Sequence, residues 1–100
     1  MKTLKINPQV YEDLEDIREY IAEDSEEQAT KVIRKILEDM ENLQKFPDMG
    51  TMLCNKVHID AKYRYIITYS YATVYYTDDE FVYVTTVLHL ARDFSRLNFK

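Results

Sequence analysis

The chain has 100 residues, of which 46% are hydrophobic and 31% are charged, and it contains one glycine, two prolines and one cysteine. A chain of this length and composition forms one domain with one core, which excludes a disordered protein or a long linker. The only cysteine, Cys54, excludes an internal disulfide and a zinc site built from several thiolates. We therefore expect a single domain over residues 1–100 that holds no metal and no other cofactor.

The formal net charge is −5, and the acidic residues are concentrated in the first half of the chain. Residues 1–50 carry 7 Lys or Arg against 13 Asp or Glu, whereas residues 51–100 carry 6 against 5. Nucleic-acid-binding proteins usually present a basic surface, so we expect no independent DNA binding. The sequence also lacks the apolar run of a membrane span or of a signal peptide, which predicts a cytoplasmic protein with no membrane contact.

Two helices are predicted in the first half, after a short strand over residues 2–7. Asn7 followed by Pro8 is typical of a helix start, and we expect the first helix over residues 8–23. Ser25 and Gln28 have the spacing of a capping box, which starts a second helix that ends before Pro47. The apolar stripes at helical spacing are Val10, Leu14, Ile17 and Ile21, followed by Ala29, Val32, Ile33, Ile36, Leu37, Met40 and Leu43.

From residue 51 onward, tyrosine, valine, isoleucine and threonine dominate, which favours strands. Strands are expected near residues 55–59, 62–69, 71–77 and 81–90, with a hairpin turn at 77–80 and a short helical segment near 91–97. These elements predict an α+β fold in which a helix hairpin packs on one face of an antiparallel sheet. The other face of the sheet would then be free to bind a partner.

The segment "VLHLARDF", residues 87–94, places His89 and Arg92 at the end of the last strand. If the strands pair as predicted, Arg64 lies beside them, and the three residues could bind an anion or act in phosphoryl chemistry. In the structural alternative, His89 makes a hydrogen bond at the strand end and Arg92 pairs with Asp93 or with a helix carboxylate. Cys54 and His58 are interpreted as a packed residue and a surface residue.

Two further residue classes have a structural and a binding interpretation. The first is a group of helix acids, which we interpret as a solvated face, with a surface that mimics DNA phosphates or docks a basic partner as the alternative: Glu12, Asp13, Glu15, Asp16, Glu19, Glu23, Asp24, Glu26 and Glu27. The second is a set of seven tyrosines in the sheet region, too many for one buried face, so that a partner-binding surface is also plausible: Tyr63, Tyr65, Tyr69, Tyr71, Tyr75, Tyr76 and Tyr83.

Four segments together resemble the RelE/ParE superfamily of bacterial type II toxin–antitoxin toxins: "NPQVYEDLEDIREYI", "NLQKFPDMG", "YRYIITYSYATVYYTDDE" and "VLHLARDF". The resemblance covers essentially the whole chain, and its most specific parts are Tyr63-Arg64, the pair Tyr71 and Tyr75, and the strand-end motif. It implies a β-α-α-β-β-β(-β) RelE/ParE-like fold, a toxic activity, a role in plasmid stabilisation, and a cognate antitoxin that wraps the toxin.

The superfamily contains two mechanistic classes. RelE-type members cut messenger RNA in the ribosome with basic residues on the sheet, whereas ParE-type members bind and poison DNA gyrase. This chain has Ala72 at a position where the RelE-type pattern has arginine, and Phe94 where many relatives have tyrosine. These departures and the acidic composition favour a ParE-like gyrase inhibitor that needs no catalytic residues. The alternatives are a ribosome-dependent endoribonuclease using His89, Arg92 and Arg64, and an inactive or repurposed binding module.

The resemblance also predicts the contact surfaces. Residues 91–100 would contact the target, and an open sheet edge or a helix groove would hold the antitoxin. The facing of strand 71–77 stays open, because hydrophobicity buries Ala72 and Val74 whereas the resemblance places position 72 on the functional face. The residues predicted to bind the target or the antitoxin are Arg64, Tyr71, Tyr75, His89, Arg92, Phe94 and Arg96.

Overall fold

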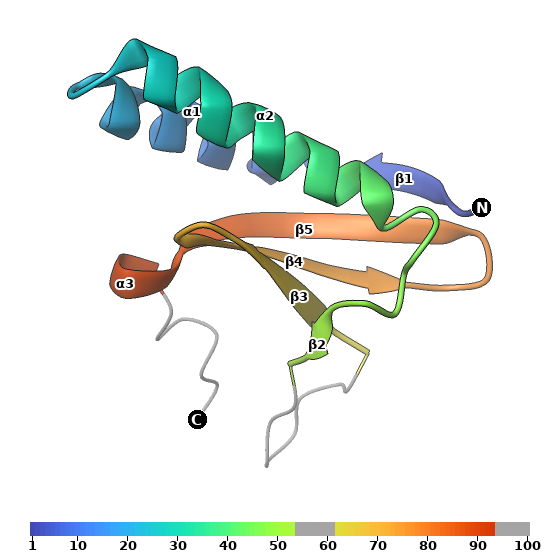
Figure 1. Ribbon diagram of the computed structural model, residues 1–100. Coiled ribbons are helices and arrows are strands. Elements are labelled where there is room, and N and C mark those ends of the chain that lie inside the picture. Colours follow the sequence, from blue (N-terminus) through green and yellow to red (C-terminus); the bar gives the residue numbers. More distant parts are fainter. Residues whose placement is uncertain (54–61, 94–100) are drawn as a thin grey trace.

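The computed structural model describes residues 1–53 and 62–93, and it confirms the α+β fold. Two helices lie side by side over one face of a sheet, and a short third helix follows the last strand (Figure 1). In chain order the elements are β1 (Thr3–Ile6), α1 (Pro8–Ala22), α2 (Glu26–Asn42), β2 (Thr51–Met52), β3 (Arg64–Thr68), β4 (Tyr71–Thr77), β5 (Phe81–His89) and α3 (Leu90–Asp93).

The five strands form one sheet in the order β1-β5-β4-β3-β2. The antiparallel meander expected from the sequence is present from β2 to β5, and β4 occupies the centre of the sheet. β1 pairs in parallel with β5, because the helix hairpin carries the chain across the sheet before the meander begins. The first strand of the chain therefore lies beside the last one.

Local side-chain chemistry sets the helix starts as predicted. The Asn7 side chain accepts a hydrogen bond from the Gln9 amide at 2.8 Å, and Pro8 occupies the first helical position. The Ser25 hydroxyl accepts from the Gln28 amide at 3.1 Å. Each cap satisfies a backbone N–H group that the first turn of a helix leaves without an internal partner.

The turn between β4 and β5 is held by the Asp78 carboxylate. It accepts hydrogen bonds from the Phe81 amide at 2.8 Å, the Glu80 amide at 2.9 Å and the Tyr83 hydroxyl at 2.9 Å. These donors stabilise the ionised form and hold the pKa of the Asp78 carboxyl below its usual value. The predicted turn at residues 77–80 is thus confirmed with a physical reason for its position.

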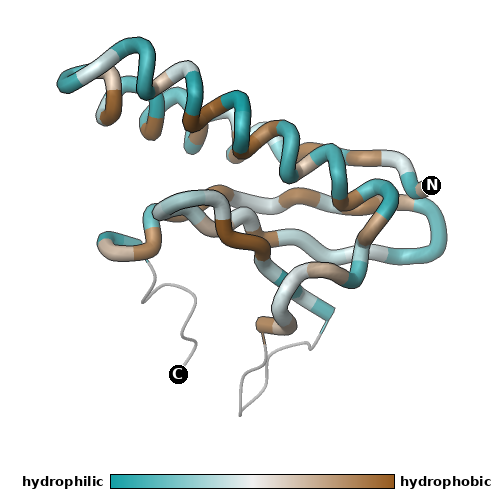
Figure 2. The backbone as a smooth tube through the Cα atoms, viewed as in Figure 1, coloured by the Kyte–Doolittle hydropathy of each residue, from teal (hydrophilic) through white to brown (hydrophobic). Residues whose placement is uncertain are grey.

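The main core lies between the helices and the sheet, where apolar positions of both layers meet (Figure 2). The apolar stripe of α1 packs on β5 and that of α2 packs on β3, as their spacing predicts, and Tyr71 and Tyr75 of β4 belong to the same core. The buried members of this cluster are Val10, Leu14, Ile17, Val32, Ile36, Met40, Leu43, Ile66, Tyr71, Tyr75, Val82, Val84 and Val87.

A second, smaller cluster covers β4 on the face away from the helices. It contains Leu53, Ala72, Val74 and Leu88, with Tyr63, Tyr65 and Leu90 packed against it. Positions 71 and 75 therefore face the helices, position 72 faces away from them, and both sides of the strand are buried. Hydrophobicity alone correctly predicted that Ala72 and Val74 are buried, but Tyr71 and Tyr75 on the opposite face are buried as well.

Several expectations fall wholly or partly outside the described residues. The strand expected near residues 55–59 does so, together with Cys54 and His58, and the structure instead has β2 at Thr51–Met52. The expected helical segment at 91–97 corresponds to α3 over its described part. Within residues 1–53 and 62–93, no helix is long and apolar enough to cross a membrane.

Candidate functional site at the end of β5

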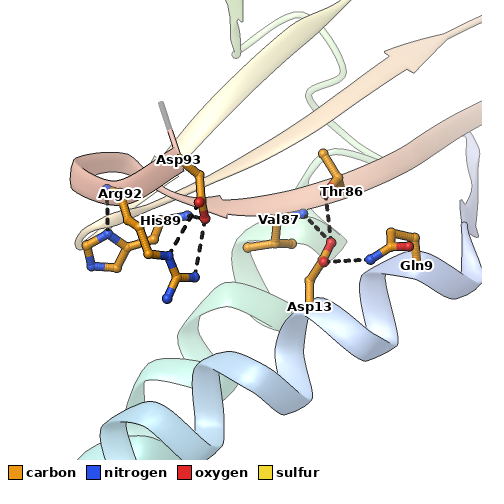
Figure 3. Close-up of polar contacts among 7 residues, drawn as sticks. All are labelled: Gln9, Asp13, Thr86, Val87, His89, Arg92 and Asp93. Atoms are coloured by element: carbon orange, nitrogen blue, oxygen red, sulfur yellow. Dashed lines mark hydrogen bonds and ion pairs between the residues drawn. The ribbon is translucent and has the colours of Figure 1, made fainter. Parts of the chain in front are cut away.

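His89, Arg92 and Asp93 form a closed set of contacts where β5 passes into α3 (Figure 3). The Arg92 amide donates to His89 Nδ1 at 3.1 Å, and the His89 amide donates to Asp93 Oδ2 at 3.3 Å. The Arg92 guanidinium binds both Asp93 carboxylate oxygens at 3.3 Å. Because Nδ1 accepts a hydrogen bond, Nε2 is the nitrogen that carries the imidazole proton in this arrangement.

Two tyrosines from distant parts of the chain complete this strand-end cluster. The His89 ring packs edge to face against Tyr71 at 5.2 Å and against Tyr20 at 6.3 Å between ring centroids. Tyr71 is buried, and this burial, reinforced by Tyr20 and opposed by Arg92, raises the pKa of its hydroxyl. Tyr20 at the end of α1 is 59% exposed. The cluster thus presents an aromatic ring, an imidazole and a guanidinium at one end of the sheet.

The cation of this cluster is exposed and already neutralised by a neighbour. The Arg92 side chain is 62% exposed, whereas that of Asp93 is 17% exposed. The hydrogen bond and charge of Asp93 raise the pKa of the Arg92 guanidinium, which keeps it protonated. Such an arrangement suits contact with a protein surface or an anion, because Arg92 can exchange Asp93 for another acceptor. The sequence offered a structural alternative in which Arg92 pairs with Asp93, and this ion pair is present in the structure.

Arg64 does not belong to this cluster, which corrects the expectation that it lies beside His89. It pairs with Tyr75 across the sheet, whereas His89 pairs with Tyr71, four residues farther along β4. At the usual rise per residue this separates them by roughly 13 Å along the strand, in addition to the width of two strand spacings. The sequence indicated the strands of the meander but not their register, so the separation of Arg64 from His89 was not predictable.

Arg64 instead holds the loop before β2. Its guanidinium donates to the Gly50 carbonyl at 2.9 Å and to the Asp48 carbonyl at 3.3 Å, and it lies 3.8 Å from the Asp48 carboxylate. The Tyr75 hydroxyl binds the same loop, donating to the Pro47 carbonyl at 2.7 Å and accepting from the Gly50 amide at 3.0 Å. Arg64 and Tyr75 therefore act together as structural residues at this end of the sheet.

Burial also corrects the expectation that Tyr71 and Tyr75 are contact residues. Tyr71 is 5% exposed and Tyr75 is 0% exposed, and both pack against the helices. The Tyr75 hydroxyl reaches backbone polar groups at the rim of the core, which is why a tyrosine suits this position. Phe94 and Arg96, the two remaining predicted contact residues, lie outside the described residues.

Asp13 links α1 to β5, which corrects the prediction that it belongs to a solvated helix face. Its carboxylate accepts from the Thr86 hydroxyl at 2.7 Å, the Val87 amide at 3.0 Å and the Gln9 side chain at 2.9 Å (Figure 3). These bonds tie α1 to β5 beside a register shift in the β4–β5 pairing. The sequence did indicate that Asp13 faces the sheet, because it lies three residues after the buried Val10 and on the same side of the helix.

The structure contains no described metal site. Within residues 1–53 and 62–93, no three metal-ligating side chains of the His, Cys, Asp or Glu type come together.

Comparison with known proteins connects this fold to one family. A family model described as the ParE toxin of the type II toxin–antitoxin system, parDE, matches residues 4–94. A chain from the chromosomal ParDE system of P. aeruginosa has a TM-score of 0.71 at 17% identity, covering 89% of this chain and 96% of that one. A chain of the YoeB dimer from Staphylococcus aureus has a TM-score of 0.56 at 17% identity, with coverages of 85% and 92%. No curated protein sequence matches the chain.

Both solved structures share the fold of this chain, and at 17% identity each of them is evidence for the fold alone. The family model has a wider reach, because it spans the chain from β1 to the end of the strand-end motif. Its match confirms the resemblance stated from the sequence and selects the ParE branch. The chain belongs to the ParE toxin family of type II toxin–antitoxin systems.

Proposed function

We propose that this chain is a cytoplasmic bacterial toxin that binds and inhibits DNA gyrase, and that a cognate antitoxin neutralises it. The observation that carries the proposal is the apolar environment of the Ala72 side chain. This residue is fully buried on the face away from the helices, among Leu53, Val74 and Leu88. In the RelE-type pattern the same position supplies a guanidinium for the phosphate, so this chain has an apolar patch where a nuclease needs a cation.

The strand-end cluster supports a binding mechanism. Tyrosine and arginine are the side chains that most often dominate protein interfaces, and here Tyr20 and Arg92 are both largely exposed at one end of the molecule. His89 lies between them and fixes the start of α3. We therefore assign target contact to Tyr20, His89 and Arg92, continuing into residues 94–100.

The proposal is tested with purified chain and gyrase. Wild-type protein is expected to stop supercoiling and to trap cleaved DNA, and Arg92→Ala to need roughly tenfold more protein, as a contact residue worth about 1–2 kcal/mol would. Arg18→Ala is the matched control, because Arg18 is also an exposed arginine paired with a carboxylate, Glu15, at 3.0 Å. If wild-type protein leaves gyrase fully active, the gyrase function is wrong.

Neutralisation is tested in cells. Expression of the chain alone is expected to arrest growth with filamentous cells and intact messenger RNA. Co-expression of a small antitoxin encoded beside its gene is expected to restore growth. Tolerance of the chain without any antitoxin would instead favour an inactive or repurposed member of the family.

A second candidate function is ribosome-dependent messenger RNA cleavage. It is favoured by the contact between His89 and Arg92, because the Nε2–H group of His89 and the nearby guanidinium could together donate hydrogen bonds to a phosphate. Arg64 is no longer part of this set. The nuclease predicts messenger RNA cleavage in a ribosomal A-site assay that His89→Ala abolishes, and intact messenger RNA with wild-type protein would refute it.

A further inference from the structure

Four aromatic side chains form a row across the face of the sheet that points away from the helices. The row lies near the β4–β5 turn (Figure 1), and we call it the aromatic row: Phe81, Tyr83, Tyr76 and Tyr63. All four side chains are partly exposed. The neighbouring positions Val82 and Val84 of β5 belong to the helix-facing core, so strand alternation places the row on the opposite face. Three of the seven tyrosines of the sheet region thus share a surface that the candidate site does not use.

The rings of the aromatic row contact one another from strand to strand. Tyr76 stacks on Tyr83 with 4.7 Å between ring centroids, and Tyr63 meets Tyr76 edge to face at 5.3 Å. Phe81 lies tilted against Tyr83 at 5.7 Å. Because some of these rings are inclined to one another rather than coplanar, the surface of the row is ridged. Aromatic surfaces with grooves between their rings are those on which proline-rich segments dock.

A lysine lies at each end of the aromatic row. The Lys5 ammonium is 4.3 Å from the centroid of Phe81, and the Lys62 ammonium is 4.5 Å from that of Tyr76. Lys5 belongs to β1 and Lys62 precedes β3, so that three strand spacings, or roughly 14 Å, separate them. Lys5 makes no ion pair within the described part of the chain. A ligand that lies along the row with an acidic group at each end complements this arrangement.

A small cavity adjoins the row where β5 bulges. The β4–β5 register shifts after Val74, which leaves Thr85 without a partner on the facing strand, and the Thr85 hydroxyl donates to the Val74 carbonyl at 3.1 Å. The cavity has a volume of about 180 Å³ and is lined by Lys5, Ile6, Asn7, Tyr76, Tyr83, Val84 and Thr85. It can take one small side chain of a ligand that lies on the row.

The aromatic row offers side-chain donors and no free backbone groups. β4 and β5 each have a strand neighbour on both sides, so a ligand on this face meets side chains alone. The hydroxyls of Tyr63 and Tyr76 make no hydrogen bond within the described residues, whereas that of Tyr83 donates to Asp78. A proline-rich segment suits such a surface, because it is extended before binding and its backbone carries acceptors but few N–H groups.

Charge favours a peptide over a single-stranded nucleic acid, the other ligand that stacks on aromatic rings. Asp78, Asp79 and Glu80 form the turn next to Phe81, and the whole chain has a net charge of −5. This turn would repel a ligand that carries a phosphate at every nucleotide. A peptide can instead place its few acidic residues at the two lysines and leave the region of the turn uncharged.

We propose that the aromatic row binds an extended, proline-rich segment of a partner protein, with an acidic residue at each end of the segment beside Lys5 and Lys62. In the polyproline II conformation each residue advances about 3.1 Å, so the roughly 14 Å between the lysines corresponds to about five residues. The row lies on the face opposite to Tyr75 and at the other end of β4 from His89. This surface is therefore additional to the gyrase contact proposed for the strand-end cluster.

The first test measures binding of the fluorescent synthetic peptide Glu-Pro-Pro-Pro-Pro-Glu by anisotropy. Wild-type protein is expected to bind it, and Lys5→Glu to bind it at least about fivefold more weakly. The peptide Glu-Pro-Pro-Pro-Pro-Lys should bind Lys5→Glu more tightly than wild type, because the reversed charges match again. Misfolding of the variant cannot produce such a reversal. Lys31→Glu, with the same charge change on the exposed side of α2, is the control that should bind as wild type does.

The second test uses Tyr76→Phe, which keeps the ring and removes a hydroxyl without a described hydrogen bond. We expect an affinity for the acidic peptide about threefold to tenfold lower and an unchanged melting temperature. Tyr69→Phe is the matched control, because Tyr69 is an exposed tyrosine on the β3–β4 turn, outside the row. Equal affinities of Tyr76→Phe and wild type would overturn the inference, since the hydroxyl would then have no role in binding.

Amide chemical shifts locate the bound peptide. Signals of Tyr76 and Tyr83 should move, while those of His89 and Arg92 should not. Absence of binding at millimolar peptide, or shifts confined to the strand-end cluster, would overturn the inference. Tighter binding of single-stranded oligothymidylate than of the peptide would also overturn it, with a nucleic acid as the occupant.

These assays contain neither gyrase nor an antitoxin, which separates this inference from the proposed function. A failure of the peptide to bind leaves the gyrase proposal unaffected. A protein that binds the peptide but leaves gyrase fully active would refute the proposed function alone.

Discussion

The two ends of β4 carry similar residues and use them differently. At one end, Tyr75 and Arg64 direct all their described polar contacts to the loop through Gly50. At the other end, the Tyr71 hydroxyl makes no hydrogen bond within the described part of the chain, and the neighbouring Arg92 guanidinium is exposed. The first end is closed by the chain itself, whereas the second retains polar groups that a partner can engage.

The comparison shows why residue type alone does not identify a functional site. Each end combines a buried tyrosine with an arginine from a neighbouring element. What separates the ends is the loop of residues 43–50, which crosses the Tyr75 end and supplies carbonyl oxygens there. The same chemistry therefore stabilises the fold at one end and remains available for binding at the other.

The largest loss of stability is expected from a substitution at Gly50, in the loop that closes the Tyr75 end of β4. A Cβ atom at Gly50 would meet the Tyr75 hydroxyl and would lie 2.9 Å from the Tyr65 carbonyl oxygen. Because that carbonyl belongs to the β3 backbone and cannot move away easily, Gly50→Ala is expected to lower the free energy of unfolding by about 3 kcal/mol. Urea denaturation measures the change. Unaltered stability would mean that the loop does not pack on the sheet as described.

Asp13→Ala removes the link between α1 and β5 near the Tyr71 end of β4, and we expect it to cause the second largest loss of stability. It removes the acceptor of the Thr86 hydroxyl and leaves the Val87 amide without its partner, so a loss of about 2 kcal/mol is expected. Asp13→Asn, which keeps one oxygen, should lose less. The control is Asp16→Ala on the exposed side of α1, whose stability should remain within about 0.5 kcal/mol of wild type. Equal losses in Asp13→Ala and Asp16→Ala would contradict the tie between α1 and β5.

The smallest losses of stability are expected when one tyrosine hydroxyl is removed at each end of β4, and these two variants compare the ends directly. Tyr75→Phe loses hydrogen bonds to Pro47 and Gly50 and should cost about 1–2 kcal/mol of unfolding free energy. Tyr71→Phe loses no described hydrogen bond and should stay within about 0.5 kcal/mol. Chemical denaturation of both variants under one condition gives the difference. Similar costs at the two positions would show that the ends are not distinct.

Much of the fold was predictable because it rests on local signals. Asn7, Pro8 and Ser25 stand where helix caps require them, and the helical stripes led to the buried face of both helices. The turn at Asp78 followed from its residue types, and the resemblance led to the ParE family. The contact of His89 with Arg92 at the end of the last strand was also predictable, since the two residues follow each other closely in the chain.

The remainder of the site depended on contacts between residues far apart in the chain. Tyr20 reaches His89 from α1, and Asp13 reaches Val87 across the helix–sheet interface. Arg64 was assigned to the wrong end of the sheet because a sequence pattern does not reveal which residues pair across strands. Spacing within one element is visible in a sequence, whereas the register between two strands is set by the packing of distant segments.

The sequence by itself determined the helices, their caps, the β4–β5 turn and the family, because neighbouring residues and their spacing decide these features. Only the tertiary structure decided that β1 pairs in parallel with β5, that both faces of β4 are buried, and that Arg64 and Arg92 lie at opposite ends of the sheet. The physical reason is that strand register and layer packing are set by the joint burial of distant segments, which no local stretch of the chain specifies.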